Sequence, residues 1–126
     1  DSGFRIQDAG GESRMSIERR KDQLQKNLDR IVQALVQRYS PESIRLFGSM
    51  SEGTIHEWSD LDLAIIKDTE KPFYERLREV AAICDSDVSV HYFVYTPEEF
   101  RRLQGSGHFF VNHEIIEKGR VLYERV

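Results

Sequence analysis

Two short apolar runs, residues 44–47 and 61–66, are the feature that most restricts the fold of this 126-residue chain. Runs of this length, bounded by glycine, serine and polar residues, are typical of buried β-strands. The first run ends in Gly48-Ser49, and the second begins between two acidic residues. The sequence therefore predicts two strands whose junction holds groups able to bind both anions and cations.

The rest of the chain shows helical periodicity, one further strand pattern and a mixed tail. Apolar spacing, proline positions and a Thr-Pro-Glu-Glu capping box mark the helices, while β-branched and aromatic residues mark the strand. The predicted elements are helix 16–38, strand 44–47, strand 61–66, helix 71–84, strand 88–95, helix 96–104, and a tail from residue 110 with a helical turn and a returning apolar segment. This order predicts an α/β (α+β) fold, a small mixed β-sheet with helices packed on it.

The chain length favours one domain. Residues 1–14 contain three glycines and no periodicity. They are predicted to be a flexible N-terminal arm or a cloning remnant, and residues 15–126 are predicted to form the domain. The predicted core therefore excludes the first fourteen residues.

Composition narrows the classes of function. The formal net charge is −4, whereas a general nucleic-acid binder would show a basic excess. The single cysteine, Cys84, cannot form an intrachain disulfide and fits a reducing, cytoplasmic setting. No apolar run approaches the ~18 residues of a membrane span, so no membrane association is expected.

Gly48 and Ser49 follow the first predicted strand and can bind a phosphate. Glycine lets a ligand approach the backbone closely, unpaired N–H groups at a helix start point outward, and the serine hydroxyl is a further donor. The alternative is an ordinary turn, in which Gly-Ser is common.

Asp60 and Asp62 stand two residues apart at the start of the second strand. In a strand, such residues point to the same face, about 6.5 Å apart along the strand. Two carboxylates this close repel each other unless one is protonated or a cation lies between them. Mg²⁺ prefers carboxylate and phosphate oxygens, so the pair is a candidate metal site; the alternative is a solvated strand face.

If the two strands are antiparallel neighbours, the phosphate-binding turn and the acidic pair meet at one sheet edge. Gly48-Ser49, ten intervening residues and Asp60-Leu61-Asp62 resemble the motif of the DNA polymerase β-like nucleotidyltransferases, above all their minimal nucleotidyltransferase domains. The capping-box segment 95–100 and the closing segment 117–123 look like this family too.

The resemblance implies a role for each motif residue. Gly48 and Ser49 would hold the triphosphate of an NTP, most simply ATP. Asp60 and Asp62 would be catalytic and would hold two Mg²⁺ ions. The reaction would transfer an NMP to a hydroxyl of a protein or small molecule, releasing pyrophosphate.

Active members of the family carry a third acid on the next strand, and the matching position here is His91. Asp87 lies four residues earlier, about 13 Å along a strand. Three interpretations stay open. Asp87 supplies the third ligand and a catalytic carboxylate, or His91 acts as a base or unusual ligand, or catalysis is impaired and the fold acts by binding a nucleotide or a partner protein.

The resemblance also suggests partners. Minimal nucleotidyltransferases are often encoded beside a HEPN-domain protein, as antitoxins, and some attach AMP to a tyrosine of that partner. A HEPN/minimal nucleotidyltransferase toxin–antitoxin pair is therefore one expectation. A homo-oligomer is also compatible with the sequence.

Overall fold

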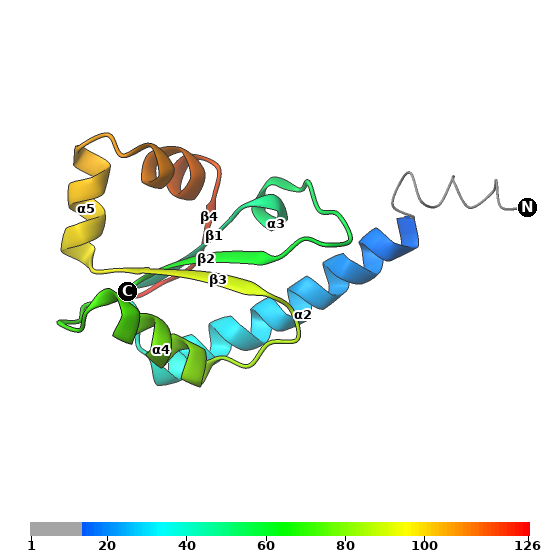
Figure 1. The fold of residues 1–126 in the computed structure, drawn as a ribbon, viewed down its shortest axis with the longest axis horizontal. Helices are drawn as coiled ribbons and strands as arrows, with labels where there is room; N and C mark the ends of the chain where they lie inside the picture. Colours follow the sequence, from blue (N-terminus) through cyan, green and yellow to red (C-terminus); the bar gives the residue numbers. More distant parts are fainter. Residues whose placement is uncertain (1–13) are drawn as a thin grey trace, which may run out of the picture.

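The strands predicted at residues 44–47, 61–66 and 88–95 are present and join a fourth strand in one mixed sheet (Figure 1). The structure, a computed structural model, describes residues 14–126, so the predicted N-terminal arm lies outside the described residues except for Arg14. The strands are β1 (Ser43–Phe47), β2 (Leu61–Ile66), β3 (Val90–Tyr95) and β4 (Arg120–Glu124), in the order β3-β2-β1-β4.

The strand directions follow from the connections. β1 is antiparallel to both β2 and β4, whereas β2 and β3 are parallel and are joined through a crossover helix. β4 was predicted only as a returning apolar segment. It becomes a strand because it pairs with the free edge of β1, a long-range contact that local patterning does not reveal.

The helices also follow the predicted order. They are α2 (Arg14–Arg38), α3 (Ser49–Glu52), α4 (Phe73–Ile83), α5 (Pro97–Gly105) and η1 (Phe110–Glu117), the last wound as a π-helix. The capping box of α5 is formed as predicted: Thr96 Oγ1 accepts from Glu99 N, and Glu99 Oε1 accepts from Thr96 N. None of the helices in the described part of the chain combines the length and apolar character that a membrane span requires.

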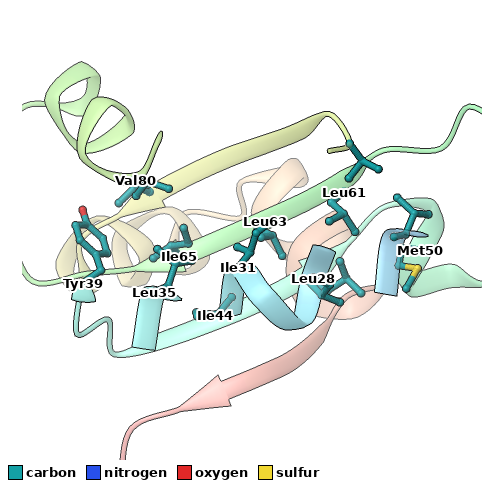
Figure 2. Packing of buried hydrophobic residues seen from close by; sticks show 14 residues of the cluster. Leu28, Ile31, Leu35, Tyr39, Ile44, Met50, Leu61, Leu63, Ile65 and Val80 are labelled. Atoms are coloured by element: carbon teal, nitrogen blue, oxygen red, sulfur yellow. The ribbon is translucent and has the colours of Figure 1, made fainter. Parts of the chain in front are cut away.

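One face of the sheet is covered by α2 and α4 (Figure 1). Leu28, Ile31 and Leu35 of α2 pack against the sheet, and Leu63 of β2 is fully buried beneath them (Figure 2). These residues lie at the helical spacing predicted from the sequence. Their burial fixes α2 along the length of the sheet.

The opposite face holds an aromatic cluster. The rings of Phe47, Phe93 and Phe110 lie 5.2–5.5 Å apart, and η1 and α5 pack over them. Alternation along β2 puts Asp62 on this same face, next to Ala64, whereas Leu61 and Leu63 face α2. Asp62 therefore lies on the face opposite the α2 core, whereas Asp60 precedes the strand.

Candidate active site

Gly48 and Asp62 are brought together by the pairing of β1 with β2. Phe47, the last residue of β1, is opposite Asp62, so the turn that follows β1 passes over the carboxylate of Asp62. Gly48 has φ 80° and ψ −162°, a conformation essentially restricted to glycine. A Cβ added at Gly48 would overlap Asp62 Oδ2 and lie 3.1 Å from Asp62 Cγ. The turn at Gly48 and the second acid of the motif thus lie in direct contact.

Asp62 is half-buried in this position. Burial raises the pKa of its carboxyl above the ordinary value, and the charge of Asp60 raises it further, while the contact with His91 opposes both effects. The carboxylate is therefore held in an environment that disfavours its own negative charge. Such a group gains most from a cation placed beside it.

His91 lies beside Asp62 because β2 and β3 are parallel neighbours with these two residues in register. Its Nδ1 is 2.9 Å from Asp62 Oδ1. The position at which the resemblance implies a third acid is therefore filled by an imidazole that contacts the second acid directly. His91 is more than half exposed, so solvent or a ligand can reach its ring.

Asp60 precedes β2 and contacts a different basic side chain. Its Oδ1 lies 3.6 Å from Nη2 of Arg20, a residue of α2. Each acid of the pair thus contacts one basic side chain: Asp60 lies beside Arg20, and Asp62 lies beside His91. No feature of the sequence around the motif pointed to Arg20, which lies forty residues away from Asp60.

Asp87 is not brought to the acidic pair. It lies in the turn before β3, where its N–H donates to Asn27 Oδ1 at 2.8 Å and its carboxylate is 3.5 Å from Arg30 Nη2. Asn27 and Arg30 belong to α2, which covers the other face of the sheet. A metal-binding role for Asp87 would require the turn that holds it to rearrange.

Ser49, the other residue of the predicted phosphate-binding turn, is connected to the acids through Ser59. Ser49 Oγ lies 3.1 Å from Ser59 Oγ, which also accepts from His56 N at 2.8 Å. Ser59 is only 2% exposed. The residue preceding Asp60 is therefore anchored to the residue that follows Gly48, a connection that the sequence motif alone did not reveal.

The donor chemistry of the site fits a hard divalent cation. Asp60 and Asp62 offer carboxylate oxygens, and the absence of a side chain at Gly48 lets the Asp62 carboxylate lie directly against the turn. Within residues 14–126, no cluster of three or more histidine, cysteine, aspartate or glutamate side chains is arranged to hold a metal. Mg²⁺ bound by one or two carboxylates takes its other ligands from water and phosphate, so the residues present fit a cation that a nucleotide would help to coordinate.

The four-stranded mixed sheet, with a glycine turn against an aspartate pair, defines a nucleotidyltransferase-fold domain. A family model described as "Polymerase beta, Nucleotidyltransferase" matches residues 29–126. The chain belongs to this family, as the motif predicted, and the family generally binds an NTP with Mg²⁺.

A solved structure supports the fold. A candidate nucleotidyltransferase from Sulfolobus solfataricus is similar with a TM-score of 0.64 and 18% sequence identity, over 87% of this chain and 88% of that chain. At this identity the likeness concerns the fold alone. No curated protein matches the sequence significantly.

Proposed function

We propose that this domain is a Mg²⁺-dependent nucleotidyltransferase that moves an NMP, most simply AMP from ATP, to a hydroxyl of a protein or small molecule. The observation that supports this proposal most strongly is the packing of the Asp62 carboxylate against Gly48. It joins a cation-binding group and a candidate phosphate-binding turn at one point. Such juxtaposition is what transfer of a phosphoryl group requires, since positioning and charge neutralisation supply most of its catalysis.

The proposal assigns a task to each residue. Gly48 and Ser49 would bind the triphosphate, and Asp60 and Asp62 would hold Mg²⁺, two ions in the full site. Bound Mg²⁺ would neutralise the negative charge of the phosphates. The acceptor oxygen would form a bond to the α-phosphorus. The bond from the α-phosphorus to the oxygen that bridges the α- and β-phosphates would break, and pyrophosphate would leave with the electron pair of that bond.

The acceptor hydroxyl must also lose its proton. His91 is the candidate base in the described structure, because its exposed imidazole lies beside Asp62 and an imidazole can take up a proton near neutral pH. The alternative base or ligand, Asp87, faces α2 instead. We therefore assign to His91, within this proposal, the role of accepting the proton of the acceptor hydroxyl.

The acceptor and partner are proposed from family likeness alone. A HEPN-domain protein, modified on a tyrosine by its antitoxin, is the candidate protein acceptor, and a cytoplasmic setting suits such a pair. Mixing the domain with ATP, Mg²⁺ and that partner should add the mass of one nucleoside monophosphate to the partner. No added mass, under conditions in which the two proteins bind, would contradict transfer to this acceptor.

Nucleotide binding can be tested without knowing the acceptor. Titration calorimetry with the non-hydrolysable α,β-methylene ATP and Mg²⁺ should detect uptake by the wild type. Asp60→Asn and Asp62→Asn should abolish it, whereas Asp87→Asn should leave it unchanged. Absence of magnesium-linked uptake of any nucleotide would refute the proposal, and loss of uptake in Asp87→Asn would show that the turn rearranges.

A second function is favoured by the pairing of both acids with basic side chains. With Asp60 beside Arg20 and Asp62 beside His91, the domain can also be a catalytically impaired module that binds a nucleotide or covers a partner protein. If Asp60→Ala and Asp62→Ala leave neutralisation of the partner intact, binding alone suffices. If they abolish neutralisation while the fold persists, metal binding or chemistry is required.

A further inference from the structure

We propose that Arg20, on the N-terminal part of α2, is a positioning residue for the acidic pair, and that it acts by holding the linker 53–60 in place through the Ser59 carbonyl. Its Nε donates to Ser59 O at 2.8 Å, and its Nη2 lies 3.6 Å from Asp60 Oδ1. The consequence for catalysis rests on the proposed function, whereas the effect on the linker does not.

The contact is made by the N-terminal part of α2, ahead of the helix's first fully buried residue. Leu24 is the first buried residue of the helix, so the turns from Arg14 to Gln23 extend beyond the core toward the α3–β2 linker (Figure 1). The Arg20 side chain is nevertheless only 18% exposed. Its guanidinium contacts both Ser59 and Asp60 of the linker.

The guanidinium is itself held in one orientation. Nη1 donates to Gln23 Oε1 at 3.0 Å, one turn further along α2, while Nε faces the Ser59 carbonyl. Two hydrogen bonds in the plane of the guanidinium leave it little rotational freedom. Arg20 can therefore act as a rigid connection between α2 and the linker.

Ser59 transmits this connection to both halves of the site. Its carbonyl accepts from Arg20, its hydroxyl is bonded to Ser49 Oγ and His56 N, and Asp60 follows it directly. A shift of Ser59 would move Asp60 relative to both Ser49 and Asp62. Holding one buried serine in place thus keeps the first acid in register with the phosphate-binding turn.

The charge of Arg20 and its hydrogen bond can be separated by substitution. In Arg20→Gln, Nε2 lies as many bonds from Cα as Nε does in arginine, so the donor to Ser59 O is kept while the charge is lost. Arg20→Met removes both the donor and the charge, with a side chain about as long as that of glutamine. Both variants lack the positive charge of Arg20, so any effect of that charge on metal affinity is the same in both. A difference between them therefore reports the hydrogen bond to Ser59 O alone.

Trp58 reports on the linker directly. It is the only tryptophan of the chain, it is 76% exposed, and it precedes Ser59. Its fluorescence anisotropy, excited selectively over tyrosine, should fall in Arg20→Met and stay near the wild-type value in Arg20→Gln. Arg30→Met is the matched control, because Arg30 also lies on α2 and forms an ion pair at 3.5 Å, but with Asp87.

Manganese binding to the nucleotide-free protein gives a second readout. MnCl₂ titration followed by electron paramagnetic resonance should show Arg20→Met binding about fivefold more weakly than Arg20→Gln, the effect of one hydrogen bond. The proposal would be overturned if Arg20→Met had the same Trp58 anisotropy as the wild type. It would also be overturned if Arg20→Gln and Arg20→Met lowered the anisotropy equally. If the wild type binds no metal, the proposed function fails while the anisotropy still decides the role of Arg20.

Discussion

The carboxylate of Asp62 lies against the α-carbon of Gly48 so closely that one added methyl group would overlap it. The pairing of Phe47 with Asp62 in the sheet creates this contact. Position 48 therefore needs glycine for two reasons: residues with a side chain rarely adopt its backbone conformation, and a Cβ would overlap the Asp62 carboxylate. The stability of the domain and the geometry of its site therefore depend on the same residue.

Gly48→Ala should destabilise the domain by about 2–4 kcal/mol, the sum of a strained backbone and an overpacked contact. Urea unfolding measures this change. Gly53→Ala is the control, because Gly53 also has a positive φ of 78° but no atom within 4 Å of an added Cβ. It should cost only about 1–2 kcal/mol, and an equal loss in both variants would contradict the overlap with Asp62.

The overlap can be relieved from the other side. In an Asp62→Ala background the carboxylate is gone, so Gly48→Ala should cost less than it does in the wild type. The double-mutant cycle isolates this term from the backbone strain, which is the same in both backgrounds. Additive effects of the two substitutions would show that the carboxylate does not press against position 48.

Asp62→Asn should stabilise the domain at pH 7 in the absence of divalent metal, by about 3 °C in Tm. The pKa of Asp62 is raised in the fold, mainly by burial, despite the contact with His91. The folded state thus favours the protonated carboxyl, and this contribution is present below the ordinary pKa of 3.8 and lost as the pH rises through the raised value.

Thermal melts of wild type and Asp62→Asn between pH 3 and pH 8 test this sign. The difference in Tm should be largest at neutral pH, should shrink as the pH falls through the raised pKa of Asp62, and should be lost below the ordinary value of 3.8. Added Mg²⁺ should reduce the difference in Tm at pH 7, because it should stabilise the wild type and not Asp62→Asn. A variant less stable than the wild type at neutral pH would mean that the His91 contact outweighs burial.

His91→Asp should convert the site into one that depends on metal for stability. Three carboxylates would then face one another, so the variant should be less stable than the wild type at pH 7 without metal. Millimolar Mg²⁺ should restore Tm, giving a larger magnesium-dependent shift than in the wild type. If the domain is catalytically impaired by its histidine, the same substitution should raise transfer activity.

His113→Asp is a suitable control for this experiment. His113 Nδ1 lies 2.9 Å from Glu117 Oε1, the same distance as in the pair formed by His91 and Asp62, but on η1. Its replacement also puts an aspartate beside a carboxylate, without a second acid of the motif next to it. A magnesium-dependent Tm gain as large in this control as in His91→Asp would count against a site at Asp60 and Asp62.

Arg76→Met should destabilise the domain by about 2 kcal/mol at pH 7, since it removes the partner of a charged pair that is partly desolvated. Arg76 is 8% exposed in its side chain and binds both oxygens of Glu99, at 2.7 and 3.1 Å, linking α4 to α5. Urea unfolding measures the loss. Lys71→Ala, which breaks the more exposed pair with Glu79, should cost clearly less than Arg76→Met, because solvent screens an exposed ion pair.

The same pair predicts sensitivity to acid. The hydrogen bonds from Arg76 are the main reason that the pKa of Glu99 is lowered. This stabilisation is complete above the ordinary pKa of 4.5 and is lost as the pH falls through the lowered value. Glu99→Gln should therefore flatten the pH dependence of stability below pH 4.5. If the loss of stability below pH 4.5 were the same in this variant as in the wild type, the pair of Arg76 and Glu99 would not be its cause.

Much of the fold was predictable because its information is local. Strand β2 was predicted with its observed bounds, Leu61–Ile66, and the capping box at Thr96 began a helix as expected. Apolar periodicity and proline or glycine positions act within a few residues, so they can be recognised without knowing what packs against them. The motif at Gly48, Asp60 and Asp62 was recognisable for the same reason.

The sequence by itself determined which residues are available for chemistry at the β1–β2 junction and that His91 stands where a third acid was expected. Only the tertiary structure decided that Asp62 presses on Gly48 and contacts His91, that Asp87 faces α2, and that Arg20 holds Ser59. These relationships join residues from different elements. They depend on strand register and on the packing of α2 across the sheet, which long-range burial sets and local patterns do not encode.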